Sequence, residues 1–305
     1  MRIVFAGSPA AAVPSLQALI DGPHEVVGVI TREPAPQGRK RTLTPTPVAE
    51  LAGRAGLPLI ETNRLGPVTD ELIALDADLG VIVAYGGLVR EPLLSAPRLG
   101  WINLHFSLLP RWRGAAPVQR AVMAGDQESG VSVFRLVPEL DAGDLLATEP
   151  TMIGRNETAG HLLEVLAVRG AQVLASVVDR LDAGTVSAVP QTGEPSYAPK
   201  LALEDGRIDW ADPAERVDAI IRGVTPEPGA FTEIAGERLK IHEAAIAHGV
   251  ARLTPGGIEL RAGKVLVGTS SEPLELLRVQ PAGKTAMDAA AWWRGRPPGA
   301  TVVAG

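Results

Sequence analysis

The stretch WINLHFSLLPRWRG, residues 101–114, decides both the fold class and where to look for a functional site. Apolar residues alternate with Asn103 and His105 along its first half, as in a β-strand, so Asn103 and His105 lie on one face. The second half, with its proline and glycine, is typical of a loop. An amide and an imidazole at the carboxyl end of a strand occupy the place where open α/β sheets bind their ligands.

The first half of the chain alternates apolar runs of strand length with helical patterns. Thr46 and Pro47 pair an N-cap residue with a proline at the first helical position, which predicts the start of a helix. Strands separated by helices indicate an α/β fold whose mostly parallel sheet is covered on both faces. The predicted strands span residues 3–6, 26–30, 57–60, 79–85, 101–106, 131–137 and 145–151, and the predicted helices span 11–20, 46–55, 69–75 and 158–181.

The character of the chain changes after Gly184. Residues 189–199 contain three prolines and no apolar periodicity, which is typical of a linker. Beyond Arg207 we expect one helix and then short strands separated by Gly and Pro turns, at the spacing of a small barrel or sandwich. We therefore predict a first domain over 1–188, a linker over 189–206 and a smaller domain over 207–305. The helix spans 213–222, and the strands span 230–234, 238–245, 257–261, 264–266 and 274–279.

Composition excludes several classes of protein. The chain has 305 residues, of which 46% are hydrophobic and 21% charged, so it can bury a sizeable core. It has no cysteine, which excludes disulfides, thiol catalysis and Cys-ligated metals. Its five histidines show no metal-ligand spacing, and we expect no metal. It shows no leader peptide and no apolar run of membrane-spanning length, so we expect a cytoplasmic protein without a membrane partner.

The charge is distributed unevenly. A net charge of −6 argues against a general nucleic-acid-binding protein. From Gly236 onward, however, nine Lys and Arg oppose six Asp and Glu, a net of +3, which leaves the rest of the chain, with 20 basic and 29 acidic residues, at −9. A mildly basic tail is compatible with a partner that carries phosphates.

The candidate chemistry is acyl transfer. Asn103 supplies an amide N–H for a developing oxyanion, and His105 an imidazole that moves protons near neutral pH. Asp141 and Asp144 lie in the loop that follows the 131–137 strand. In a parallel sheet this loop could lie beside the end of the strand that carries Asn103 and His105. A carboxylate there would orient the imidazole or take a proton. The alternative is that Asp141 and Asp144 are turn and cap residues, as is more usual for Asp-x-Gly sequences. Ser107 has no strained elbow around it, which favours direct attack by an external amine.

The same stretch resembles the signature of a known family. Residues 103–120, NLHFSLLPRWRGAAPVQR, are similar to the central motif of the folate-dependent formyltransferases. Three further segments are similar to that family: the opening strand and helix at 5–14, the basic loop at 37–41 together with 45–48, and residues 197–210. The resemblance therefore runs over nearly the whole chain. Within the family the chain most resembles the members that act on initiator methionyl-tRNA. It departs from them at Ala10 and Ala11, where an acidic residue and a phenylalanine are usual.

The resemblance implies a fold, a reaction and a set of site residues. The fold would be a Rossmann-like sheet domain followed by an OB-like β-barrel that binds tRNA. The reaction would carry a formyl group from 10-formyltetrahydrofolate to the α-amino group of methionine on initiator tRNA, for translation initiation, by a monomer. The catalytic residues would be Asn103, His105 and Asp141, with Asp141 favoured over Asp144 by the family's motif. The folate-binding residues would be Ser107, Leu108, Leu109, Pro110, Val83, Ala84, Tyr85, Gly86 and Gly87, and the tRNA-binding residues Arg39, Lys40 and Arg41.

Other readings remain open on the sequence. A formyltransferase that acts on a sugar nucleotide, on glycinamide ribonucleotide or on another small amine would use the same three residues. A non-catalytic tRNA- or folate-binding module is disfavoured by the complete set of Asn103, His105 and Asp141. A nucleotide-dependent dehydrogenase is disfavoured because no Gly-x-Gly-x-x-Gly follows the first strand.

Overall fold

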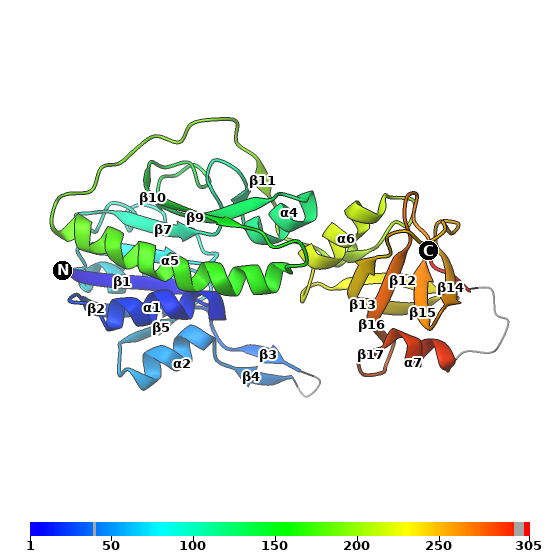
Figure 1. Cartoon of the computed structure of the whole chain (residues 1–305). Coiled ribbons are helices and arrows are strands. Elements are labelled where there is room, and N and C mark those ends of the chain that lie inside the picture. Colours follow the sequence, from blue (N-terminus) through cyan, green and yellow to red (C-terminus); the bar gives the residue numbers. More distant parts are fainter. Residues whose placement is uncertain (39–40, 296–301) are drawn as a thin grey trace. The chain divides into compact units, whose positions relative to one another are not determined.

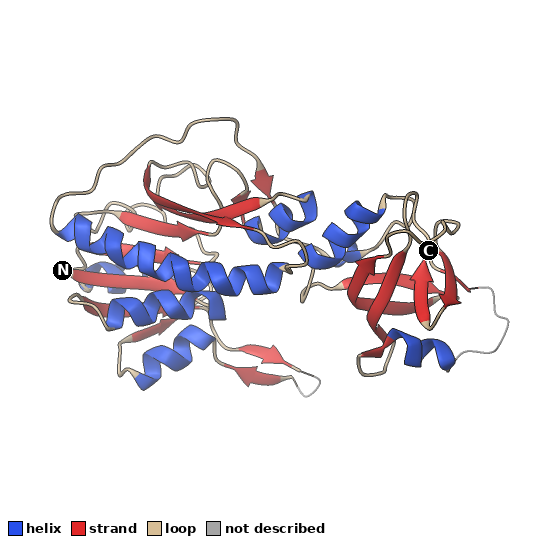
Figure 2. Cartoon of the chain, viewed as in Figure 1, coloured by secondary structure: helices blue, strands red, loops and turns tan. Residues whose placement is uncertain are grey.

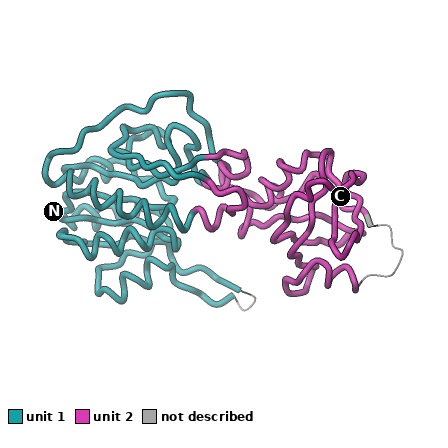
Figure 3. The backbone as a smooth tube through the Cα atoms, in the orientation of Figure 1, with its two compact units in different colours: residues 1–117, 128–152, 163–198 teal, residues 118–127, 153–162, 199–305 magenta. Residues whose placement is uncertain are grey.

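The computed structural model describes residues 1–38, 41–295 and 302–305. The chain forms two compact units (Figure 3). Unit 1 consists of residues 1–117, 128–152 and 163–198, and unit 2 consists of 118–127, 153–162 and 199–305. Each unit is therefore assembled from separate stretches of sequence.

Unit 1 is built on a seven-stranded sheet in the order β10-β9-β7-β6-β1-β2-β5 (Figures 1 and 2). The five strands from β7 to β5 are parallel, which confirms the mostly parallel α/β fold. The strands are β1 (Arg2–Gly7), β2 (Glu25–Thr31), β5 (Leu59–Glu61), β6 (Leu79–Val83), β7 (Trp101–His105), β9 (Glu128–Arg135) and β10 (Leu145–Met152).

One expectation about this sheet is wrong. Strand β9 runs antiparallel to β7, with His105 opposite Ser132 and Ile102 opposite Arg135. The chain leaves the carboxyl end of β7, forms α4 (Pro117–Ala124) and enters β9 from that same end. A parallel pair would need a connection that crosses to the other end of the sheet, and this connection does not cross. The loop after β9 therefore starts at the opposite end of β7 from His105 and has to fold back to reach it.

The two faces of the sheet differ. Helices α1 (Val13–Ile20) and α5 (Ala159–Asp182) run across one face (Figure 1). A Cβ on Gly170 of α5 would lie only 3.0–3.3 Å from side-chain carbons of Leu104 and Val131, so these strands and α5 pack closely. The other face carries a second core that includes Ile82, Tyr85 and Trp101. Asn103 and His105 share that second face, since they alternate with Leu104.

Unit 1 also contains two shorter helices and a hairpin. Helix α2 (Pro47–Arg54) starts at Thr46, whose hydroxyl accepts a hydrogen bond from the backbone N–H of Ala49 at 3.0 Å, as the sequence predicts. Helix α3 is Thr69–Ala74. Strands β3 (Ala35–Gln37) and β4 (Thr42–Thr44) form an antiparallel hairpin in the segment that the sequence treats as a plain loop (Figure 1).

Helix α5 is long and apolar enough, by length and composition, to cross a membrane. Its mean hydropathy over an 18-residue window is 1.4. Leu166, Leu174 and Val177 on this helix are fully buried. Its apolar side therefore serves the core of unit 1, which accounts for its composition.

The strand order contains a topological switch point, which is a known kind of ligand site. From β1 the chain proceeds outward to β2 and β5, and then returns to β6 on the other side of β1. Open α/β sheets bind ligands outside the carboxyl ends of the strands at such a switch point. Here those ends are Gly7 and residues 83–87.

Unit 2 carries an antiparallel sheet in the order β12-β13-β16-β15-β14-β18, with β17 paired to β16. Ala304, next to β18, bridges back to Ile234 of β12, so the strands close into a barrel, as expected. Helix α6 (Ala214–Gly223) packs its buried side into the core. The strands are β12 (Ala230–Ile234), β13 (Glu237–Ile246), β14 (Gly257–Arg261), β15 (Lys264–Val267), β16 (Leu274–Pro281), β17 (Met287–Asp288) and β18 (Val302–Val303), and α7 (Ala289–Arg294) follows β17.

Candidate active site

His105 ends β7 and is buried, with a residual exposure of 6%. Its Nε2 lies 2.8 Å from the carbonyl oxygen of Trp112. Because a carbonyl only accepts, Nε2 carries the proton, and in the neutral ring the lone pair sits on Nδ1. Burial lowers the pKa of His105, and the nearby Asp141 carboxylate and the Trp112 hydrogen bond oppose that shift only in part. The imidazole is therefore neutral at pH 7 and ready to take a proton at Nδ1.

Asp141 brings its carboxylate to that nitrogen. Its Oδ2 lies 3.9 Å from His105 Nδ1 and accepts a hydrogen bond from the backbone N–H of Gly114 at 2.7 Å. Both side chains are mostly buried, at 7% and 11% exposure, so their electrostatic interaction is weakly screened. The distance exceeds that of a hydrogen bond. The carbonyl of Trp112, rather than Asp141, therefore fixes the orientation of the ring.

Asn103 lies two residues before His105 on the same face of β7 and is half-buried. Within the described part of the chain its side-chain amide makes no hydrogen bond. An amide with unused N–H groups beside a neutral imidazole provides a donor for an oxyanion. The structure thus brings together all three residues that the sequence selects for catalysis.

Three non-glycine residues with left-handed backbones lie in the loops of the candidate site. Asp141, Trp112 and Ala84 all adopt left-handed conformations, with φ of 46°, 61° and 49°. Such angles are unfavourable for non-glycine residues and are commonly held at functional sites. Here Trp112 presents its carbonyl to His105, and Asp141 presents its carboxylate.

The predicted folate segment, Ser107 to Pro110, is a firmly held loop. Ser132 on β9 is fully buried. Its hydroxyl accepts a hydrogen bond from the backbone N–H of Leu109 at 3.1 Å and donates one to the carbonyl of Ser107 at 2.7 Å. The Ser107 hydroxyl donates to the carbonyl of Arg111 at 2.6 Å. Leu108 lies over Gly130, which leaves no room for a Cβ there. The loop is preorganised directly beside His105.

The second predicted folate segment, Val83 to Gly87, follows β6 at the switch point. Val83 and Tyr85 are buried in the core, and the Tyr85 hydroxyl donates to the carbonyl of Thr62 at 2.9 Å. Burial raises the pKa of Tyr85, so its phenol stays neutral. Ala84 and Gly86 are exposed, and therefore only these residues and Gly87 present surface to a ligand.

Of the predicted tRNA-binding residues, Arg41 lies in the turn between β3 and β4 and is exposed, and its backbone N–H donates to the carbonyl of Gly38 at 3.1 Å. Arg39 and Lys40 lie outside the described residues. The exposed hairpin carries Leu43, which is 66% exposed.

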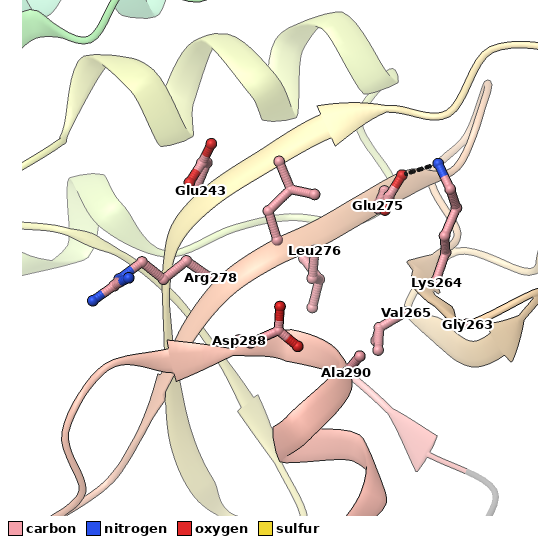
Figure 4. Close-up of a pocket in the computed structure, with 10 residues that line it drawn as sticks. Glu243, Gly263, Lys264, Val265, Glu275, Leu276, Arg278, Asp288 and Ala290 are labelled. Carbon is pink, nitrogen blue, oxygen red and sulfur yellow. Dashed lines mark hydrogen bonds and ion pairs between the residues drawn. The ribbon is translucent and has the colours of Figure 1, made fainter.

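A cavity of about 400 Å³ opens on unit 2 (Figure 4). None of the predicted site residues lines it. Three carboxylates and two cations face it, and Lys264 is already paired with Glu275 at 2.7 Å, so the cavity does not favour phosphate. Across the described residues, no group of three or more His, Cys, Asp or Glu gathers as metal ligands. The cavity is lined by Glu243, Gly263, Lys264, Val265, Glu275, Leu276, Leu277, Arg278, Asp288 and Ala290.

Comparison with known proteins identifies the family of this chain. Residues 1–178 match the formyl transferase family, and residues 200–297 match the formyl transferase C-terminal domain. A methionyl-tRNA formyltransferase from Clavibacter sepedonicus is 59% identical over 296 residues, which cover 97% of each chain. Another, from Arthrobacter sp. (strain FB24), is 50% identical and also covers 97% of each chain. This chain belongs to the methionyl-tRNA formyltransferase family.

More distant solved structures share the fold. An N-formyltransferase from Helicobacter canadensis, solved with folinic acid and dTDP-3-aminofucose, aligns with a TM-score of 0.70 at 16% identity, over 92% of this chain and 98% of that chain. HypX from Aquifex aeolicus, in complex with tetrahydrofolic acid, aligns with a TM-score of 0.60 at 18% identity, over 96% of this chain and 46% of that chain. This fold is therefore shared with an N-formyltransferase and with HypX.

Several residues that build the site are not among those predicted. Trp112 acts through its carbonyl and Gly114 through its N–H, and backbone groups have no sequence signature. Ser132 has one weak signal, because a polar residue facing the core of an apolar strand needs a partner. Gln191, which bonds to the Asp141 loop, lies in the segment that the sequence assigns to a linker.

Proposed function

We propose that this enzyme transfers the formyl group of 10-formyltetrahydrofolate to the α-amino group of methionine on initiator tRNA. The observation that carries the proposal is the Asp141 carboxylate 3.9 Å from the buried His105 ring, on a strand that also presents the Asn103 amide. Family membership supports the acceptor, because relatives at 50–59% identity over 97% of the chain are named for methionyl-tRNA. The expectation of a cytoplasmic monomer goes with this proposal.

In the proposed mechanism the methionine amine attacks the formyl carbon that the folate co-substrate supplies. The C–N bond that forms replaces the bond between that carbon and the folate nitrogen. Asn103 donates an N–H to the oxygen on which negative charge develops. His105 Nδ1 and Asp141 together receive the proton that the amine loses and return it to the departing folate nitrogen, so the site ends as it began.

The site offers the folate co-substrate the carboxyl ends of β6 and β7. Leu108 supplies a half-buried apolar side chain beside His105, and Ala84 and Gly86 supply exposed backbone at the switch point. The Leu109 N–H and the Ser107 carbonyl are bonded to Ser132, which holds this loop in place beside the co-substrate. We assign co-substrate recognition to these two strand ends.

The decisive experiment is an acceptor assay. The purified full-length chain is mixed with 10-formyltetrahydrofolate and methionyl initiator tRNA, and N-formylmethionine is quantified after hydrolysis of the ester. Elongator methionyl-tRNA and dTDP-3-aminofucose serve as competing acceptors, the second because of the structural likeness at 16% identity. Formylation of the amino sugar alone would replace the proposed acceptor, and formylation of neither would refute the function.

We expect Asn103→Ala to lower kcat by about 10²–10³-fold, the effect of removing one oxyanion donor. The KM for both substrates should change little, because the amide acts mainly in the transition state. Asn156→Ala, at an exposed position, is the matched control and should keep wild-type kinetics. Wild-type turnover in folded Asn103→Ala would remove the amide from the mechanism.

We assign the basic segment Arg39, Lys40 and Arg41 to the phosphates of the tRNA acceptor stem. Replacing all three with glutamine should weaken tRNA binding and lower the slope of log K against log salt by about 2.7, since each duplex phosphate contact contributes about 0.9. Filter binding at several salt concentrations measures this slope, with Arg64→Gln as a control at an exposed position. Folate binding should be unaffected. An unchanged slope would place the tRNA contacts elsewhere.

A further inference from the structure

The segment that follows α5 is hydrogen-bonded to other parts of unit 1 and is not a free connection. Val189 exchanges two backbone hydrogen bonds with Leu145, at 2.8 and 2.9 Å. Further on, β11 (Tyr197–Ala198) pairs with β8 (Arg113–Gly114). Both attachments lie within unit 1. Residues 189–198 are therefore hydrogen-bonded next to the two loops that contain Asp141 and Trp112.

Gln191 is the side chain in this segment that touches both loops. Its Nε2 donates to the carbonyl of Asp141 at 2.8 Å and to the carbonyl of Gly143 at 2.9 Å. Its Oε1 accepts from Arg113 Nη2 at 2.6 Å and from Arg113 Nε at 3.3 Å. Both N–H groups and the oxygen of this half-buried amide are thus in use.

The hydrogen bonds of Gln191 matter because they hold the turn that carries the Asp141 carboxylate. Asp141 is in a left-handed conformation and follows a strand that runs away from His105, so its loop must fold back and stay folded. Gly143 lies so close to the carbonyl of Arg135 that a Cβ would not fit. The two hydrogen bonds from Gln191 cap this turn at the residue that carries the carboxylate.

The other loop needs support for a different reason. Trp112 gives its carbonyl to His105, and Gly114 gives its N–H to Asp141. Arg113 lies between them in the sequence, and its guanidinium donates a hydrogen bond to the side chain of Gln191. The backbone N–H of Trp112 also donates to Ser196 Oγ at 2.9 Å, and that of Arg113 to the carbonyl of Ser196 at 2.8 Å. The segment 191–196 thus joins the partner of His105 to the loop of Asp141.

We propose that Gln191 is a positioning residue of the transfer reaction, which fixes Asp141 opposite His105 through the backbone of the 141–143 turn and through Arg113. The inference rests on the proposed function. It adds that the segment between the two matched family domains belongs to the catalytic apparatus, although Gln191 itself does not touch the reacting atoms.

The test compares Gln191→Met with Gln191→Glu in the full-length chain. Methionine keeps the length of the side chain and removes every hydrogen bond, and kcat should fall by up to about 100-fold, as expected for a group displaced by about 1 Å. Glutamate keeps the acceptor for Arg113 but turns an oxygen toward two carbonyls, so it should lose at least as much. Thr192→Ala, at the exposed neighbouring position, should behave as wild type.

Each outcome decides the role of Gln191. A folded Met variant with kcat within about threefold of wild type would overturn the proposal, because displacement of a catalytic group has a far larger effect. A fully active Glu variant would reduce Gln191 to a partner of Arg113 and would also overturn it. If the Met variant does not fold, the Glu variant, which retains the Arg113 contact, gives the answer.

A second measurement does not depend on any substrate. The His105 ring is titrated by NMR in wild type and in Gln191→Met, with the signal assigned through His105→Gln. Because the Asp141 carboxylate raises the pKa of this imidazole, releasing Asp141 should lower it, toward the value in Asp141→Asn. An unchanged titration would overturn the positioning role even if the enzyme formylates another acceptor, whereas inactivity of wild type on methionyl-tRNA would refute only the proposed function.

Discussion

Replacing His105 with alanine is expected to lower kcat by about 10²–10⁴-fold, the usual contribution of a positioned proton-transfer group. The imidazole is buried, held by Trp112 at Nε2, and kept neutral so that Nδ1 accepts the proton lost by the amine. Single-turnover formylation with saturating substrates measures the chemical step directly. His161→Ala, at a side chain that is 66% exposed, is the matched control. Wild-type turnover in His105→Ala would eliminate the proposed proton path.

The buried His105 imidazole also makes the stability of the protein depend on pH. The pKa of His105 is lowered from 6.5, so below that pH the unfolded chain binds more protons than the folded chain. The wild type therefore loses stability as the pH falls below about 6.5, to the extent that this imidazole resists protonation. His105→Gln keeps a donor for Trp112 but does not titrate, and its unfolding free energy should fall less between pH 7 and pH 5. Equal slopes for both proteins would contradict the lowered pKa.

Asp141→Asn is the second large effect, and we expect a loss in kcat of about 10²–10⁴-fold, as for removal of a proton-transfer group. Asparagine tolerates the left-handed backbone at this position, and its Oδ1 still accepts from Gly114. The variant therefore keeps the loop and removes only the charge that faces Nδ1. Alanine would also disturb the turn, which makes it the poorer probe.

Asp144→Asn is the natural control for this experiment. Asp144 lies three residues further along the same loop and is exposed, and the sequence offered it as the alternative carboxylate. Its side chain should be dispensable, with kcat close to that of wild type. The reverse result, an active Asp141→Asn and an inactive Asp144→Asn, would transfer the role to Asp144.

The sequence predicts the fold well where local signals are strong. Apolar runs bounded by Gly, Pro and cap residues place the seven strands of the unit 1 sheet to within a few residues, as β6 and β7 illustrate. Helices α4 and α7 were not anticipated, because they are short and follow loops. The predicted direction of β9 is wrong. An apolar strand has the same pattern in either orientation, and only the path of the connecting segment decides its direction.

The candidate site was predictable as a set of side chains but not as a geometry. Two residues apart on one strand, Asn103 and His105 had to share a face. That Asp141 reaches them depends on Gly114, Gly143 and Gln191, which no periodicity links to β7. A proline-rich segment gives no indication that it will lie bonded along a catalytic loop, because its contacts are long-range and made largely by the backbone.

The left-handed backbones of Ala84, Trp112 and Asp141 set a limit on how this enzyme can be made more heat-resistant. Each such residue carries about 1–3 kcal/mol of conformational energy that glycine would relieve. Thermal selection would therefore favour glycine at Ala84, whose side chain is a single methyl group, while selection for turnover keeps the Asp141 carboxylate where it is. Gains in thermostability are better sought at a remote position in open space, such as Gly53 in α2, where alanine is the better helix former.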